Sequence, residues 1–205
     1  MKLILLILVF SFTQTITAQY SALEIKSCKT TDNATYLNQI EKDVLYYINL
    51  VRINPKKFSE IILAPFLSKN PDYSKKYCKS LFKRLNKTTP LAVLKPAEDL
   101  FYFSRNHAHS KGKKGDTGHR STKGKSFAKR TNKLIKKYAV VGENIHYGSN
   151  NALEIVIDLL IDDGIKDLGH RENILEKDFV YCSASIQKHK KFRYNCVIDF
   201  AGKKN

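Results

Sequence analysis

The stretch NNALEIVIDLLIDDGIKDLGHRENIL, residues 150–175, carries an apolar segment into two carboxylates, a glycine-led turn and a histidine. Asn151 suits the start of a capping box, and the apolar residues after it predict a buried helix. Asp162, Asp163 and His170 follow close to where that helix ends. Carboxylates and imidazoles bind divalent ions and take part in acid–base chemistry, so this stretch contains candidate site residues next to a buried helix.

Further helices are predicted upstream of this stretch. NQIEKDVLYYINLVR, residues 38–52, has apolar residues at helical spacing, and Asn54 with Pro55 predicts the cap and the first turn of a second helix. A third helix is expected over residues 96–111, which begin with proline and two acidic residues. Residues 68–90 are expected to form a basic connector at the edge of the domain.

Strands are predicted in the second half of the chain. KYAVVGENIHYG, residues 137–148, is β-branched around Gly142, which indicates a strand with a close backbone approach. VYCSASIQKHKKFRYNCVIDF, residues 180–200, is typical of a hairpin centred on His189. Helices, a strand, a helix and then two strands lack the regular alternation of a doubly wound parallel sheet. The order predicts an α+β fold, a three-layer α-β-α sandwich with a central, mainly antiparallel sheet.

The first 18 residues have the pattern of a secretory signal peptide. Lys2 supplies the positive start, residues 3–12 are apolar, and Ala18 is a small residue suited to cleavage. A retained anchor is the alternative, but the apolar run is shorter than the roughly 20 residues that span a bilayer. We therefore expect a secreted or extracellular protein, or a periplasmic or envelope protein if the source is bacterial. The predicted segments are a signal peptide at 1–18, an N-terminal arm at 19–37 and one domain at 38–205.

Four cysteines in an exported chain predict two disulfide bonds. Cys182 and Cys196 are equidistant from His189, the centre of the predicted hairpin, so they are expected to face each other across two strands. Cys28 and Cys78 would then pair by elimination.

The chain is strongly basic, with a formal net charge of +17. Between Lys111 and Lys137, eleven basic residues stand against the single acid Asp116. Such a charge favours anionic partners such as acidic glycans or phosphate-rich surfaces, and a solvated lysine-rich surface is the alternative reading. Few aromatic residues interleave with this basic segment, which argues against a nucleic-acid platform.

Four segments carry a candidate ligand next to a glycine: His119 in GDTGHR, Glu143 in GENI, Asp162 and Asp163 in IDDG, and His170 in LGHRENIL. Glycine lets the backbone turn sharply or approach closely, as expected where loops converge on a cleft. Two imidazoles and two carboxylates can hold zinc, or a carboxylate can fix the tautomer of an imidazole base. The alternative is a set of unrelated surface groups, because the gaps between the segments are too long for a local motif.

These motifs, in this order, resemble those of a known family. Together with NLVRINP at residues 49–55 and CVIDFAG at 196–202, they resemble the CAP superfamily of cysteine-rich secretory, antigen 5 and pathogenesis-related proteins, whose core is the SCP-like extracellular domain. The resemblance covers residues 40–202. It implies an α-β-α sandwich with a cleft that is lined by two histidines and two acidic residues and can bind a divalent metal.

Carried over by motif, the first histidine of that cleft is His119, the acid of GENI is Glu143 and the second histidine is His170. In many relatives the second acid is a glutamate that follows a tryptophan. This chain has no tryptophan, and the position falls on Asp162 or Asp163, whose shorter carboxylates put the metal geometry in question. The resemblance implies that the helix brings one of these aspartates to the cleft and the glycine turn brings His170 back beside it.

The resemblance and the candidate residues favour a secreted, monomeric binding module that is not an enzyme. Its cleft would hold a divalent metal such as zinc, and its basic surface would engage a lipid, a sterol, a glycan or another anionic partner. A hydrolase that cleaves a peptide or an ester with a metal-bound water or an imidazole base is the alternative. A third class, a cationic adhesive or membrane-active protein, needs no such cleft.

Overall fold

A four-stranded mixed sheet forms the centre of the molecule in the computed structural model, which describes residues 19–205. The signal peptide predicted at 1–18 lies outside these residues. The strands are β1 (Lys95–Pro96), β2 (Val141–Tyr147), β3 (Tyr181–His189) and β4 (Arg193–Ala201), in the order β1-β3-β4-β2. Only the short β1 runs parallel to its neighbour β3, and the other pairs are antiparallel.

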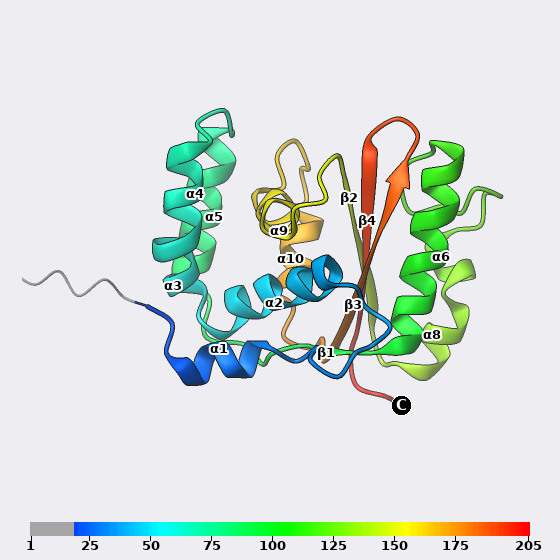
Figure 1. Ribbon diagram of the computed structural model, residues 1–205, viewed down its shortest axis with the longest axis horizontal. Coiled ribbons are helices and arrows are strands. Elements are labelled where there is room, and N and C mark those ends of the chain that lie inside the picture. Colours follow the sequence, from blue (N-terminus) through cyan, green and yellow to red (C-terminus); the bar gives the residue numbers. More distant parts are fainter. Residues whose placement is uncertain (1–18) are drawn as a thin grey trace, which may run out of the picture.

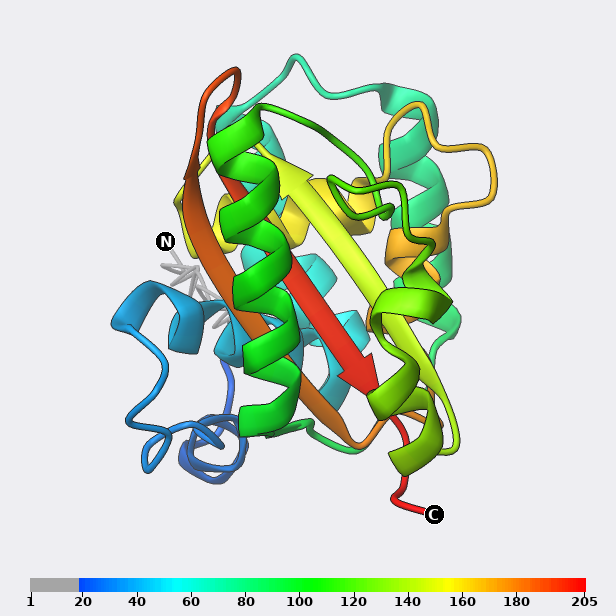
Figure 2. The same cartoon turned by 90° about the vertical axis from the view of Figure 1, so that its right-hand side faces the viewer.

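Helices cover both faces of this sheet. On one face lie α2 (Gln39–Ile53), α9 (Ala152–Ile161) and α10 (Gly169–Ile174), and on the other lie α6 (Glu98–Lys114), α7 (Phe127–Arg130) and α8 (Asn132–Lys137) (Figures 1 and 2). This arrangement confirms the predicted α+β class and the mainly antiparallel sheet.

The remaining helices lie outside the α2 and α9 layer. They are α1 (Ala22–Cys28), α3 (Pro55–Phe58), η1 (Ser59–Leu63), α4 (Ala64–Lys69) and α5 (Lys75–Lys87) (Figure 1). The N-terminal arm that contains α1 contacts α2, because the Tyr20 hydroxyl donates a hydrogen bond to the Leu50 carbonyl at 2.9 Å. No helix within residues 19–205 is both long and apolar enough to cross a bilayer.

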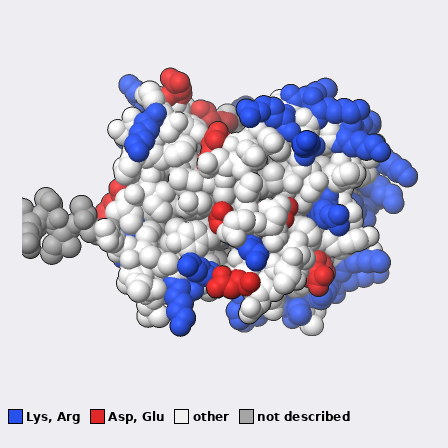
Figure 3. Space-filling model, in the orientation of Figure 1, with Lys and Arg blue, Asp and Glu red and all other residues white. Residues whose placement is uncertain are grey.

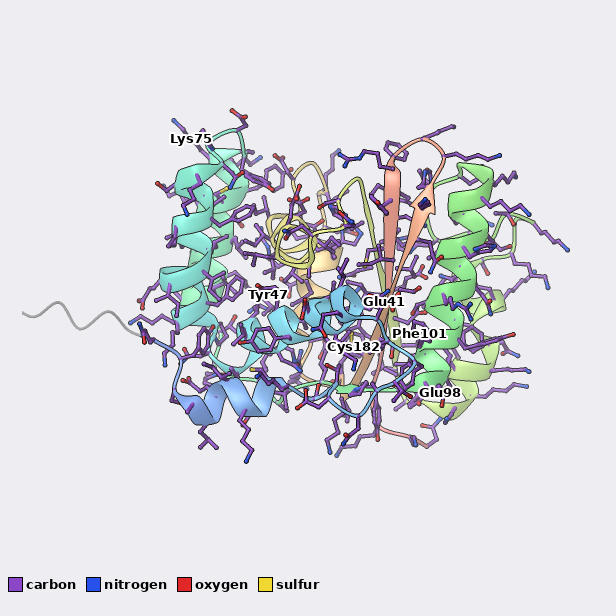
Figure 4. The ribbon with its side chains drawn as sticks, in the orientation of Figure 1. Glu41, Tyr47, Lys75, Glu98, Phe101 and Cys182 are labelled. Atoms are coloured by element: carbon purple, nitrogen blue, oxygen red, sulfur yellow. The ribbon has the colours of Figure 1, made fainter. Side chains whose placement is uncertain are left out.

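Caps fix where the predicted helices begin. Asn38 and Glu41 form a reciprocal capping box at the start of α2, and the Asn54 side chain accepts from the Lys57 amide at the start of α3, as the sequence predicts. Glu41 also joins α2 to the sheet, because its Oε1 accepts from the Ile186 amide at 3.0 Å (Figure 4). Asn151 caps α9 by accepting from the Glu154 amide at 3.1 Å.

The main hydrophobic core lies between the sheet and the α2 and α9 layer. Val44, Ile48, Ile155 and Leu160 are all fully buried there and pack in one cluster with Phe200 of β4. A smaller cluster on the opposite face contains four buried residues, Leu100, Leu134, Tyr138 and Ala201. Burial of each large aliphatic side chain contributes roughly 1.5–3 kcal/mol, so these two clusters stabilise the three layers.

Two predicted boundaries along the chain are wrong. Helix α6 continues past Gly112 to Lys114 and ends at Gly115, whose φ of +80° is the left-handed conformation that favours glycine. Gly112 instead allows a close contact, because a Cβ there would lie 2.1 Å from the Lys188 carbonyl oxygen of β3. Residues 75–87, which fall within the predicted connector, form α5.

The predicted disulfide pairing is also wrong. The hairpin turns after His189, which pairs with Arg193, so Cys182 faces Phe200 and Cys196 faces Ile186. Cys182 and Cys196 are therefore displaced along the strands, and they are free thiols, as are Cys28 and Cys78. His189, the last residue of β3, is buried.

Candidate functional site: two histidine–carboxylate pairs

His119 and Glu143 form the first pair. His119 lies in the loop between α6 and α7, and Glu143 lies on β2. The His119 Nδ1 is 2.7 Å from Oε1 of Glu143, whose side chain is only 1% exposed while the imidazole is half exposed. Because a carboxylate accepts hydrogen bonds, this contact requires a hydrogen on Nδ1 and leaves Nε2 of the neutral ring as a bare nitrogen.

Arg130 at the end of α7 completes this pair. Its guanidinium forms an ion pair with Oε2 of Glu143, and its Nε donates to the His119 carbonyl at 3.0 Å. Both oxygens of Glu143 are therefore engaged, one by an imidazole and the other by a guanidinium. Sequence reasoning missed Arg130, because it is one of many basic residues in a segment that has no recognisable motif.

Three side chains contact the backbone of the loop that carries His119. His189 Nε2 is 2.9 Å from the Asp116 carbonyl oxygen. Lys111 Nζ donates to the Thr117 carbonyl at 2.8 Å. His107 Nε2 is 3.2 Å from the Gly118 carbonyl, and burial lowers the pKa of His107 to about 4, so the buried ring is neutral. These contacts fix the backbone immediately before His119.

The second pair is His170 with Asp162. Asp162 ends α9 in the left-handed conformation with a φ of 58°, and its Oδ1 lies 2.6 Å from His170 Nδ1. Its Oδ2 accepts from the backbone amides of His170 and Arg171, at 3.0 and 3.3 Å. Asp163 is exposed and lines a separate cavity with Tyr73, so Asp162 is the aspartate that the structure pairs with His170.

Asparagines connect the two pairs across β2. Asn144 donates to the His170 carbonyl at 2.9 Å, while Asn173 of α10 donates to the Glu143 carbonyl at 3.3 Å and to the Asn144 side chain at 2.8 Å. Glu143 and Asn144 are neighbours on β2, so their side chains point to opposite faces. The two pairs thus flank the same segment of the edge strand.

Both pairs share one chemical feature. In each, a buried carboxylate holds Nδ1 and leaves Nε2 as the nitrogen that can bind a metal or accept a proton. Both carboxylates orient an imidazole in this arrangement, which is one of the two roles that the sequence left open for them, the other being that of a metal ligand. Within residues 19–205, no three His, Cys, Asp or Glu side chains are grouped so that they could hold an ion.

A third buried acid lies next to the first pair. Asp199 of β4 is the cross-strand neighbour of Glu143, is fully buried, and accepts from the Ser104 hydroxyl at 2.9 Å. Its other oxygen has no hydrogen-bond partner among the described residues. Burial, assisted by the negative charge of Glu143, raises the pKa of Asp199 well above its usual range. The strand sequence CVIDFAG gave no signal for this contact beyond an acid at an inward-facing position.

Comparisons with known proteins give structural likeness only. A scan of protein-family models and a search of curated proteins both return no match. An outer surface protein of Borrelia burgdorferi is 20% identical with a TM-score of 0.47, over 64% of this chain and 95% of that one. An extracellular SCP-domain protein of Bacillus anthracis is 16% identical with a TM-score of 0.46, over 73% of this chain and 44% of that one. Venom allergen-like protein 4 of Schistosoma mansoni is 13% identical with a TM-score of 0.48, over 82% and 91%.

The fold and the site define an α-β-α protein with two histidine–carboxylate pairs at the edge strand of its sheet.

Proposed function

We propose that the chain is an extracellular binding module of the CAP type, in which His119 and His170 together hold one divalent ion such as zinc. The observation that supports the proposal is that each imidazole is held at Nδ1 by a buried carboxylate, which leaves both Nε2 atoms available. Histidines that bind metals in proteins almost always donate their other ring hydrogen to such a partner.

The hydrogen bonds of the two acids support a modified form of the predicted ligand set, in which the histidines alone would bind the ion. Glu143 already accepts from His119 and Arg130, and Asp162 from His170 and two backbone amides, so both acids suit an orienting role. The ion would then be held by two Nε2 atoms, with solvent or an external ligand completing its coordination. When bound, it would supply a positive centre for a carboxylate or phosphate group of a partner.

Zinc titration by calorimetry tests this proposal. His119→Ala and His170→Ala should each weaken zinc binding at least tenfold, because each removes one of the two protein ligands. His109→Ala is the matched control, since His109 is an exposed histidine on α6 outside the pairs. Zinc affinity that is unchanged in both site variants, or lowered equally by the control, would remove the metal from the proposal.

The basic surface is the second part of the proposed function. The segment 111–137 adjoins the β3–β4 turn, where the Lys190 amide donates to the Gly112 carbonyl at 3.1 Å. It also adjoins the C-terminus, where the Asn205 amide donates to the Lys137 carbonyl at 3.0 Å. Lysine and arginine side chains crowd this end of the molecule, over α6, α8 and the turn (Figure 3). We infer that this surface attracts an anionic partner, such as an acidic lipid or glycan.

A hydrolase remains the alternative, and it would use the same imidazoles. The exposed Nε2 of His119, oriented by Glu143, has the arrangement of a general base. Glu143→Gln removes the charge that fixes this tautomer and should abolish any peptide or ester hydrolysis. Absence of turnover by the unaltered, zinc-loaded protein in a broad peptide and ester screen would exclude the hydrolase for those substrates.

A further inference from the structure

A cavity of about 730 Å³ lies between the start of α2 and the first half of α6. It is lined by residues of the loop before α2, of α2 and of α6, and by Gln187 of β3. The two histidine–carboxylate pairs flank β2, which β4 separates from β3 in the sheet. The cavity is therefore distinct from the proposed ion site, and either site can fail without the other.

One face of α6 supplies four of the lining residues. They are spaced at helical intervals along a single side of the helix: Glu98, Phe101, Tyr102 and Arg105. Tyr36, from the loop before α2, also lines the cavity, and its ring lies 5.4 Å from that of Phe101. Figure 4 shows Phe101 and Glu98 near the start of α6, on the side towards Glu41 of α2. Aromatic rings and an acid thus share one wall of the cavity.

Glu41 brings a buried negative charge to the wall opposite α6. It is only 3% exposed, and its two oxygens accept from the backbone amides of Asn38 and Ile186, both at 3.0 Å. Asn38 and Gln187, the neighbour of Ile186, line the cavity, so the carboxylate lies at the cavity wall. Within residues 19–205, Glu41 forms no ion pair. Buried carboxylates are rarely left without a cation, so a positive group in the cavity would supply a missing partner.

The lining carries a negative charge although the chain as a whole is strongly basic. It contains three carboxylates, of Glu41, Glu98 and Asp99, and the guanidinium of Arg105. Asp99 is already paired with Lys137 at 2.5 Å, so one negative charge remains in excess when that lysine is counted. Glu98 is exposed and forms no ion pair within the described residues. An incoming cation therefore meets one buried and one accessible carboxylate that have no cationic partner.

We propose that this cavity binds an organic ammonium ion. The carboxylates of Glu41 and Glu98 would attract the positive group, and the rings of Phe101 and Tyr102 would contact it and its alkyl stem. An ammonium group is attracted to the face of an aromatic ring, while the methylene groups behind it pack on apolar surface. A neutral ligand would leave Glu41 without a cationic partner, and an anion would be repelled by both carboxylates.

Titration of the ¹⁵N-labelled protein with butylammonium at pH 7, followed by ¹H–¹⁵N correlation spectra, tests the proposal. Butanol and butyrate are matched probes, because they carry a similar alkyl chain with no charge or with a negative charge. Butylammonium at millimolar concentration should shift the amides of residues 36–41 and 98–105 and leave those beside His119 and His170 in place. The other two probes should bind at least about fivefold more weakly. No shift at these residues, or equal affinities for butylammonium and butanol, would overturn the proposal.

Two variants separate ligand binding from a structural role. Tyr102→Leu keeps an apolar side chain but removes the ring, at a residue that is 64% exposed. It should weaken butylammonium binding about threefold and leave the affinity for butanol unchanged. Glu98→Gln should weaken butylammonium binding about threefold. Glu60→Gln is its matched control, because Glu60 is an exposed glutamate on η1 outside the cavity. Equal butylammonium affinities in Glu98→Gln and Glu60→Gln would contradict the proposal.

The ammonium group can belong to a free amine or to a lysine side chain of a partner polypeptide. Nα-acetyl-lysinamide distinguishes these sources, since it carries the same four-carbon ammonium chain on a peptide backbone. Affinity at least equal to that of butylammonium would indicate a lysine side chain, and weaker affinity would indicate a free amine. Both results support the proposal, whereas failure of Nα-acetyl-lysinamide and butylammonium alike to bind would refute it.

Discussion

At the scale of single residues, the sequence identified the histidines and acids but not what each nitrogen and oxygen does. His119, Glu143 and His170 followed from their motifs, and the structure decides between Asp162 and Asp163 through the 2.6 Å contact to His170. Motifs report residue types, whereas the state of a ring nitrogen depends on partners brought close by folding. Arg130 and Asp199 were missed for the same reason, since neither has a signal of its own.

His107 carries a pH-dependence that follows from its burial. Its pKa is lowered from 6.5 to about 4, so the unfolded chain binds more protons than the folded chain between these values. The contribution of His107 to stability is therefore fully present above pH 6.5 and falls by up to about 3 kcal/mol as the pH drops towards 4.

His107→Gln should remove this part of the pH-dependence, because glutamine can donate to the Gly118 carbonyl but does not titrate. The measurement is the free energy of unfolding in urea at several pH values between 4 and 7. Other groups, including Asp199, titrate in both proteins, so only the difference between the two curves is diagnostic. Parallel curves for the variant and the original protein would contradict the role given to His107.

At the scale of elements, the sequence predicted those helices and strands whose residue spacing and caps lie within one segment of the chain. The helices α2 and α9 and the strand β2 were predicted because apolar spacing and caps lie within each segment. Helix α5 was missed because lysines dominate its composition, although Leu81 and Leu85 are spaced one turn apart and are both fully buried. The hairpin register was missed because its symmetry was placed at His189 rather than in the turn after it.

The contact between α6 and β3 depends on Gly112. Gly112→Ala should destabilise the protein by about 1–3 kcal/mol, since the new methyl group would lie 2.1 Å from a backbone oxygen that cannot move aside freely. Thermal or urea unfolding measures the effect. The control is Gly169→Ala, where φ is not positive and an added Cβ would have ordinary contacts of 3.6 Å or more. A loss of stability no larger than that of Gly169→Ala would show that the two elements are not packed this closely.

At the scale of the whole molecule, the α-β-α class followed from the order of predicted elements, whereas the position of the short strand β1 beside β3 did not. Two residues of parallel pairing have no sequence signature, because strand periodicity needs four or more residues. The distribution of charge on the surface likewise required the fold. In the folded chain, segment 111–137, the β3–β4 turn and the C-terminus lie together at one end of the molecule.

Charge reversal tests the function proposed for that end. Lys190→Glu with Lys191→Glu should weaken binding to phosphatidylserine vesicles at least about tenfold, because each basic residue near an anionic membrane contributes about 1 kcal/mol. Lys26→Glu with Lys29→Glu is the matched control, an equal charge change on exposed residues at α1. Vesicle sedimentation at low and high salt measures the effect. Equal losses in the two variants, or binding that persists at high salt, would argue against a localised basic surface.

The central claim is that one ion joins the two histidine–carboxylate pairs. Anomalous diffraction at the zinc edge, from crystals grown with zinc, tests it most directly. We expect a single peak about 2.0–2.1 Å from Nε2 of both His119 and His170, with Glu143 and Asp162 still on the Nδ1 atoms. A peak bound to only one of these histidines, or separate peaks on each of them, would contradict the claim.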